Sequence, residues 1–151
     1  MKEVVIRDFK ERDIEKILDY REESGRISFP ELTIDRERAK GYIIGHVKKY
    51  PGTLKIAELD GKPVGFIRFH LEEGSFGDYG LIDIIFVEKS HREMGIGKLL
   101  IQEAEKWFHS KGIYRIEAVI TNTNSPSINF FKSHSYSEKR TVFEKSLTKN
   151  T

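Results

Sequence analysis

The sequence predicts a single α/β (α+β) domain in which about four helices flank a mixed, mostly antiparallel central sheet. Apolar runs of strand length alternate along the chain with segments that carry apolar residues at helical spacing. The pair Asp60-Gly61 between two such runs is typical of a β-hairpin. With 151 residues, of which 38% are hydrophobic and 33% charged, the chain has the size and composition of one globular domain, residues 1–151.

The first third of the chain is expected to hold one strand and two helices. Residues 4–7 are mostly β-branched, which favours a strand, and residues 11–22 then place apolar side chains at helical spacing. A polar segment with glycine and proline, residues 23–33, separates this helix from a second one at 35–49. Tyr50-Pro51-Gly52 ends the second helix.

Three strands are expected in the middle of the chain. Residues 54–59 and 63–71 lie on either side of the Asp60-Gly61 turn and should pair antiparallel. After a loop at 72–80, the run from Leu81 to Val87 is rich in β-branched and aromatic residues, as a strand buried on both faces is.

The remaining third is expected to alternate between helix and strand. A helix begins near Ile96 and ends at Lys111-Gly112, where the glycine favours a helix cap. Residues 115–120 form a strand and residues 125–133 a helix. The tail at 138–147 has room for one or two short strands.

The strongest functional signal is the segment 87–99, V-E-K-S-H-R-E-M-G-I-G-K-L, which joins a strand to a helix. Gly95 and Gly97 allow the main chain to approach a ligand, and the free N–H groups of the helix's first turn favour an anion there. One residue separates these glycines, and Leu100 stands where a dinucleotide fingerprint needs a third. The P-loop pattern G-x-x-x-x-G-K-[ST] is also absent, so the segment matches neither of these nucleotide-binding motifs.

This segment resembles the pyrophosphate loop of the GNAT family of N-acetyltransferases. Arg92-Glu93-Met94-Gly95-Ile96-Gly97 fits the family pattern [Q/R]-x-x-G-x-[G/A], and Val87 lies eight residues before the first glycine, as is usual in that family. Residues 4–18 look like the family's opening, a strand that ends in Arg7 and a helix with an acidic residue near its start.

A third segment extends the resemblance to nearly the whole chain. Residues 124–136 are similar to the family's pattern N-x-x-[A/S]-x-x-[F/L]-Y-x-x-x-G-F. Two positions depart from it, because Phe131 stands in the tyrosine place and Ser135 in the glycine place.

The resemblance implies acetyl-CoA as cosubstrate and no metal. The pyrophosphate would bind the main chain of the glycine loop, and the pantetheine arm would pair with the strand edge before it, where that strand diverges from the strand at 115–120. Lys132 is placed to meet the 3′-phosphate. The implied cofactor-binding residues are Ile85, Phe86, Val87, Arg92, Glu93, Met94, Gly95, Ile96, Gly97, Lys98, Asn124, Phe131 and Lys132.

Acetyl transfer to an amine needs a proton acceptor, because an alkyl ammonium has a pKa of about 10.4. Asp83 is the first candidate for the base, since it interrupts an otherwise apolar strand next to the cofactor edge. A solvent-facing position or a local ion pair would equally explain an aspartate there. His70, Glu72 and Glu73 at the end of the preceding strand are rivals.

The leaving group raises a second question. Phe131 occupies the usual position of the tyrosine acid and has no hydroxyl to donate to the departing thiolate. Ser133, Tyr136 or an ordered water could supply part of this stabilisation. We expect the Phe131 ring to pack against the pantetheine end.

Composition excludes several other classes of protein. There is no cysteine, so disulfides, a thiol nucleophile and thiolate metal sites are impossible. The net charge of +2 is interspersed along the chain, which gives no grounds for a nucleic-acid partner. No apolar run reaches the length of a signal segment or membrane span, so a cytoplasmic protein without membrane contact is expected. His91, His109 and His134 show no metal-ligand spacing.

Two function classes stay open at this point. The first is an N-acetyltransferase that moves an acetyl group from acetyl-CoA to a primary amine by direct attack in a ternary complex; the amine belongs to a small molecule, a peptide N-terminus or a lysine. The alternative is a non-catalytic acyl-CoA-binding module with a sensing or structural role. The acidic residues Glu22, Glu23, Glu31 and Asp35 would attract a cationic amine at long range. Both a monomer and a homodimer are compatible with the sequence.

Overall fold

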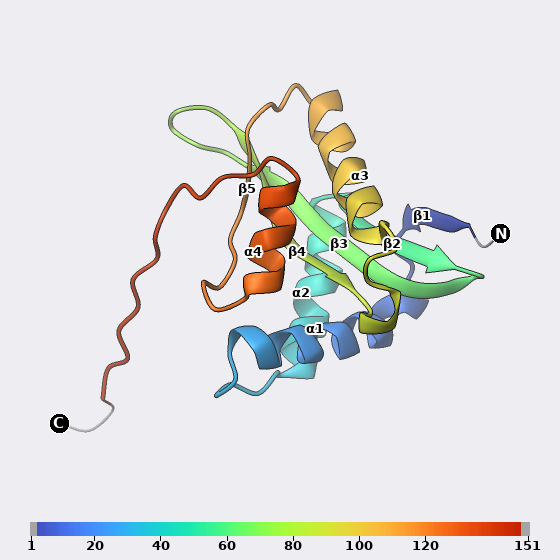
Figure 1. Ribbon diagram of the computed structural model, residues 1–151, viewed down its shortest axis with the longest axis horizontal. Helices are drawn as coiled ribbons and strands as arrows, with labels where there is room; N and C mark the ends of the chain where they lie inside the picture. Colours follow the sequence, from blue (N-terminus) through green and yellow to red (C-terminus); the bar gives the residue numbers. More distant parts are fainter. Residues whose placement is uncertain (1–2, 149–151) are drawn as a thin grey trace.

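The computed structural model describes residues 3–148 and confirms the predicted α/β class (Figure 1). Five strands form one sheet in the order β1-β2-β3-β4-β5; the first four pair antiparallel, and β5 pairs parallel with β4. The strands are β1 Val4–Asp8, β2 Leu54–Leu59, β3 Lys62–Glu72, β4 Tyr79–Val87 and β5 Ile116–Ala118. The helices are η1 Glu11–Asp13, α1 Ile14–Ser28, α2 Arg36–Lys49, η2 Lys89–His91, α3 Ile96–Ser110 and α4 Ser125–Ser133.

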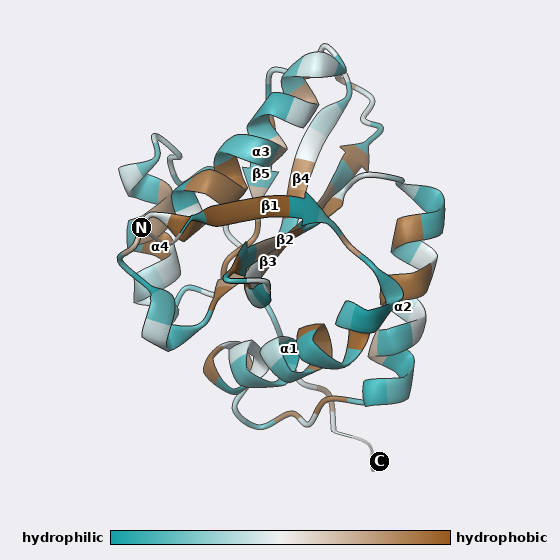
Figure 2. Cartoon of the chain, turned by 90° about the vertical axis from the view of Figure 1, so that its right-hand side faces the viewer, coloured by the Kyte–Doolittle hydropathy of each residue, from teal (hydrophilic) through white to brown (hydrophobic). Residues whose placement is uncertain are grey.

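The sheet lies between two pairs of helices. Helices α1 and α2 cover one face, where Ile17, Ile43 and Phe66 belong to one buried cluster. Helices α3 and α4 cover the other face, where Phe69 and Phe108 belong to a second cluster. Figure 2 shows the strands between α3 on one side and α1 and α2 on the other. Each face of the sheet therefore has its own core, and a side chain's place along a strand decides which helix pair it meets.

An ion pair holds the start of α1 against the first strand. Two nitrogens of the Arg7 guanidinium lie 2.8 and 2.9 Å from the two carboxylate oxygens of Asp13, and Arg7 Nε donates to Glu58 at 2.7 Å. Burial alone would raise the pKa of Asp13, but the hydrogen bonds from Arg7 and from the Lys10 N–H outweigh it and hold that pKa below its ordinary value. The strand-to-helix opening expected from the sequence is thus joined by a bidentate pair.

Three boundaries differ from the sequence prediction. Helix α1 continues to Ser28, six residues past its expected end, because Gly25 is tolerated within it and only the residue before Pro30 is kept out of the helical region. Strand β5 covers three residues rather than 115–120. The prediction of strands at 138–147 is wrong, since that part of the described chain holds neither helix nor strand. Because β5 is short, it offers few backbone hydrogen-bond partners to this tail, and Phe143 within the tail is 93% exposed.

None of the helices within residues 3–148 combines the length and the apolar character that crossing a bilayer requires.

Candidate active site

A β-bulge places the predicted base. Arg68 of β3 pairs with Ile84 of β4, but the next residue, Phe69, pairs with Ile82, so Asp83 is the extra residue of the bulge. Although they are two positions apart, Ile82 packs in the cluster beneath α3 and Ile84 packs against the cluster beneath α1 and α2. The bulge lets β4 change face at Asp83.

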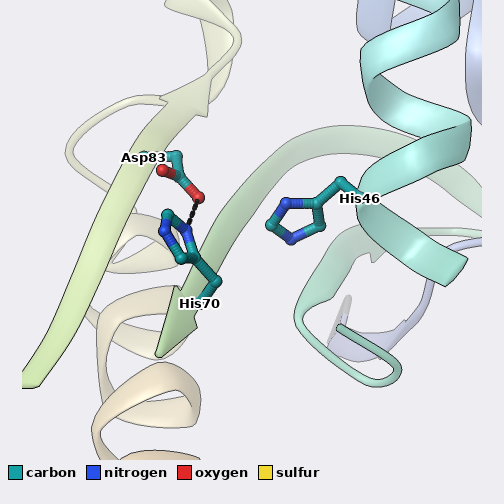
Figure 3. A group of neighbouring side chains, drawn as sticks. All are labelled: His46, His70 and Asp83. Carbon is teal, nitrogen blue, oxygen red and sulfur yellow. Dashed lines mark hydrogen bonds and ion pairs between the residues drawn. The ribbon is translucent and has the colours of Figure 1, made fainter. Parts of the chain in front are cut away.

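Asp83 is held by two neighbours on β3. His70 Nδ1 lies 2.8 Å from Asp83 Oδ2, and Arg68 Nε lies 3.8 Å from the same oxygen (Figure 3 shows the first contact). The Asp83 side chain is 15% exposed. Asp83 is therefore a largely buried, partly paired carboxylate rather than a solvent-facing strand residue.

His70 contacts two carboxylates at once. Its Nδ1 faces Asp83, and its Nε2 lies 2.6 Å from Glu72 Oε1. Burial alone would lower the pKa of His70, but the hydrogen bonds to Glu72 and Asp83 outweigh it and raise that pKa above the ordinary value. Both ring nitrogens donate in the protonated form, so a protonated His70 can hydrogen-bond to both carboxylates at once.

A second histidine, His46 of α2, is neutral at physiological pH. Burial, followed by the positive charge of Arg68, lowers its pKa to about 4. Its Nε2 lies 2.8 Å from Thr53 Oγ1, and the Thr53 hydroxyl lies 2.5 Å from the Tyr50 carbonyl, to which it donates.

Ligand atoms of His46, His70 and Asp83 all lie within 4.8 Å of one another, close enough to surround a metal ion (Figure 3). In this arrangement the ring nitrogens of His70 are engaged by carboxylates, and the Arg68 cation lies beside Asp83.

The Asp83 side chain lines a cavity of about 450 Å³ between α2 and the sheet. Its walls include Arg21 of α1 and His46, Lys49 and Tyr50 at the end of α2. The acidic segment expected to attract an amine is not part of this wall. Glu22 pairs with Arg36 at 3.3 Å, and the Asp35 carboxylate accepts the Arg38 N–H as the cap of α2. The cavity itself is basic.

The glycine loop ends in a helix N-terminus that no side chain caps. Gly95 is the N-cap residue with φ +80°, a left-handed conformation that glycine adopts without strain, and Leu99 makes the first helical bond, to the Gly95 carbonyl. The N–H groups of Ile96, Gly97 and Lys98 therefore have no acceptor within the helix. The first turn of α3 carries no acidic residue. This end of α3 favours an anion.

An unpaired strand edge lies beside that helix end. β5 pairs with β4 only at Gly80, Leu81 and Ile82, so within residues 3–148 the stretch from Asp83 to Val87 has no ladder partner on that side. An extended ligand with amide groups fits such an edge as an added strand. The predicted divergence between the two strands is therefore present, and it begins at the bulge.

The other predicted cofactor residues belong to the glycine loop and to α4 with its flanking residues. Arg92 Nε donates to the Val87 carbonyl at 2.9 Å, which braces the loop against β4. Asn124 caps α4 through a 3.3 Å bond from the Ser127 N–H. Lys132 lies 3.0 Å from Glu138. Glu93 and Met94 are exposed, and Glu93 has φ +66°, a strained conformation of the kind that collects at binding loops.

Neither of the side-chain hydroxyls that the sequence proposed for stabilising the departing thiolate is free in the structure. Phe131 is 5% exposed and belongs to the core cluster, with its ring edge-on to Phe130 and Tyr136. Tyr136 donates its hydroxyl to Glu105 at 2.9 Å, and Ser133 donates to the Phe130 carbonyl at 2.6 Å. Neither hydroxyl is left over to stabilise a thiolate.

The sequence patterns did not predict the bulge, His46, or the two arginines that line the cavity, Arg21 and Arg68. A bulge leaves no trace in an apolar run. Arg68 did carry a usable signal, because Phe66, Arg68 and His70 alternate along one strand and share the buried face beneath α1 and α2. A charged residue at a buried alternating position is unusual enough to mark a site.

The chain is similar to known acetyltransferases over most of its length. The matching proteins are acetyltransferases, so the chain is an acyltransferase enzyme. Residues 14–136 match the model of the acetyltransferase (GNAT) family, and the chain belongs to that family.

Three individual proteins illustrate the match. The N-alpha-acetyltransferase of Sulfurisphaera tokodaii is 28% identical over 93% of this chain and 84% of its own length. The L-2,4-diaminobutyric acid acetyltransferase of Nocardia farcinica is 29% identical over 70% of this chain, which spans about half of that relative, 54%. The aminoglycoside N-acetyltransferase AAC(6')-Iy, solved in complex with CoA, has a TM-score of 0.72 at 22% identity and covers 97% of this chain and 96% of its own. This structural likeness bears on the fold.

Proposed function

We propose that this chain transfers an acetyl group from acetyl-CoA to a primary amine by direct attack within a ternary complex. The observation that carries the proposal is the bulge at Asp83, where the free edge of β4 begins and from which a carboxylate reaches into the polar cavity. The thioester lying along the edge and the amine lying in the cavity would then meet at one point of the strand.

Acetyl-CoA fits the residues present. Three unpaired N–H groups and an uncapped helix dipole at Gly95 suit a pyrophosphate, and the amides of a pantetheine arm match the open edge at Ile85, Phe86 and Val87. When bound, the cosubstrate supplies an activated acetyl thioester. A main-chain N–H at the divergence of β4 and β5 would donate to its carbonyl oxygen as charge develops there.

Asp83 would take the proton that the ammonium must lose before it attacks. Its Oδ2 is held by His70, and Oδ1 has no hydrogen bond in the described chain, so one oxygen remains for the amine. His70, whose pKa is raised by its bonds to Glu72 and Asp83, places a positive charge beside this carboxylate when it is protonated. The amine nitrogen would then bond to the thioester carbon while the carbon–sulfur bond breaks and the thiolate leaves with the electron pair, and the second proton of the nitrogen would pass to the thiolate or to solvent.

The range of acceptors among relatives leaves the amine open. One relative is an N-alpha-acetyltransferase and another acetylates L-2,4-diaminobutyric acid, so the possible acceptors include polypeptide N-termini and amino acids. Phe131 lacks the hydroxyl of the usual tyrosine acid, so departure of the thiolate in this chain would depend on another donor or on solvent.

A thiol-release assay with a panel of amines tests the function. We expect purified protein to bind CoA in calorimetry and to release CoA from acetyl-CoA only when an amine is present, with one equivalent of acetylated amine per thiol. CoA binding without amine-dependent release from any member of a panel of amino acids, peptides, lysine derivatives and polyamines would favour the binding module.

Replacing Phe131 with tyrosine should raise kcat about tenfold at saturating acetyl-CoA, because the new hydroxyl can protonate the departing thiolate, whose conjugate acid has a pKa of about 8.5. The matched control is Tyr136→Phe, which removes a hydroxyl that is already bonded to Glu105 and should leave kcat unchanged. An unchanged or lower kcat in Phe131→Tyr would mean that thiolate departure does not limit the rate.

A further inference from the structure

The cavity beside Asp83 carries uncompensated positive charge. Arg21, Lys49 and Arg68 contribute to its walls, and Asp83 is the one carboxylate among its lining residues. His46 is neutral at physiological pH, and the charge that His70 carries when protonated is matched by Glu72 and Asp83. A cavity built only to receive an ammonium group would have the opposite balance of charge.

Arg68 shows the imbalance most clearly. Its side chain is 21% exposed, and its Nε is a buried donor without a hydrogen-bond partner in the described part of the chain. The Asp83 oxygen at 3.8 Å is too far for a hydrogen bond. A guanidinium has five N–H donors in a planar fork that matches a carboxylate, so an unsatisfied one at a cavity wall indicates a place for an anionic partner.

Arg21 faces the same cavity from α1. It is half-buried and makes no side-chain hydrogen bond or ion pair with any residue in 3–148. Burial, followed by the positive charge of Arg68, lowers the pKa of Arg21, and the negative charge of Asp83 offsets this only in part.

Two other partly buried arginines, Arg7 and Arg36, are paired with carboxylates. Arg7, 15% exposed, bonds to Asp13 and Glu58. Arg36, 34% exposed, lies within 3.3 Å of Glu15, Asp19 and Glu22. Arg21 and Arg68 differ from these two in opening onto the cavity.

We propose that the acceptor amine carries a carboxylate close to its amino group, and that Arg68 and Arg21 bind this carboxylate while Asp83 faces the amine. Because Asp83 Oδ2 and Arg68 Nε are only 3.8 Å apart, an amine and a carboxylate separated by one or a few carbon atoms can reach both partners within the cavity. This inference rests on the proposed acetyltransferase function. The shared chemistry has two sources, a free amino acid and a polypeptide that begins with Asp or Glu.

Matched pairs of acceptors test the proposal. At saturating acetyl-CoA, kcat/KM is measured for free amino acids against their carboxamides, and for peptides that begin with Glu against peptides that begin with Gln. We expect the carboxylate member of at least one pair to be preferred tenfold or more. A preference among the free amino acids assigns the carboxylate to an amino acid, and a preference among the peptides alone assigns it to an acidic first residue.

Arg68→Gln should reduce that preference to about twofold, mainly through KM, with Arg21→Gln showing a smaller loss. Arg36→Gln removes an arginine of the outer surface and should keep the full preference. CoA affinity measured by calorimetry shows that each variant is folded. If amines are acetylated but carboxamides match or exceed the acids, or if Arg68→Gln keeps the preference, the inference is wrong while the acetyltransferase function stands. If no amine is acetylated, the proposed function itself fails.

Discussion

Asp83→Asn should lower kcat/KM about a hundredfold while the dissociation constant for CoA stays unchanged. Asparagine keeps the size of the side chain and its place in the bulge, but it cannot accept a proton from the ammonium group. General-base catalysis contributes about 10²- to 10⁴-fold, which sets the expected loss. Steady-state kinetics with the best acceptor and calorimetry with CoA separate the two effects.

The pH profile distinguishes a base from a merely structural carboxylate. In the wild type, kcat/KM should fall at low pH as the general base gains its proton, and this limb should be lost in Asp83→Asn. The positive charge of His70 beside Asp83 is present below its raised pKa and is lost as the pH rises through that pKa.

Glu72→Gln is the matched control for this experiment. It removes the other carboxylate partner of His70, at Nε2, without touching the cavity, and Glu72 is 41% exposed. We expect its kcat/KM to stay within about threefold of the wild type. An Asp83→Asn enzyme with a wild-type rate across the pH range would return Asp83 to the role of an ion-pair partner of Arg68.

The parts of this molecule that short-range patterns determine could be predicted from the sequence. The Asp60-Gly61 hairpin, α4 at 125–133 and the glycine loop before α3 each depend on a few neighbouring residues with strong local preferences. Arg7 and Asp13 are close enough in sequence that a strand followed by a helix brings them together.

The catalytic side of the site could be predicted only in part, because it depends on sheet register. Asp83 stood out as a polar residue in an apolar strand, but which face it occupies is decided by the bulge between β3 and β4. Its meeting with Arg68, His70 and His46 joins β4 to the preceding strand β3 and to α2, which lies about 40 residues earlier in the chain. Alternation of side chains predicts which face each one takes only while the strand stays regular. One extra residue at a bulge moves every later side chain to the other face, and the alternating pattern does not reveal this change.

Both halves of the proposed reaction meet at one strand. Main-chain groups on the edge of β4 are available from Asp83 onward because β5 leaves the ladder after Ile82. In the proposed mechanism the side chain of Asp83 removes the proton of the amine in the cavity. Since both features lie at the bulge, substitutions that straighten β4 should affect cofactor and acceptor together, whereas changes at the α3 loop should affect the cofactor alone.

Gly95→Asp should weaken CoA binding about thirtyfold, or about 2 kcal/mol, relative to Gly95→Asn. Gly95 has φ +80°, and a Cβ added to it would meet no atom within 4 Å, so the neighbouring packing tolerates a side chain there. Asparagine and aspartate both adopt the left-handed conformation more readily than other residues, so the pair differs mainly in charge. Gly97 is unsuitable, because a Cβ there would lie 2.8 Å from the Phe130 ring.

The thermal stability of the two Gly95 variants without CoA provides an independent control for their CoA affinities. A carboxylate at the uncapped N-terminus of α3 interacts favourably with the helix dipole, so the Asp variant should unfold at a temperature equal to or above that of the Asn variant. The same carboxylate occupies the place of the pyrophosphate and repels it, so CoA affinity should change in the opposite direction. Calorimetry with CoA and thermal unfolding without it measure both quantities. Equal CoA affinity in the two variants would place the phosphates elsewhere and remove the glycine loop from the cofactor site.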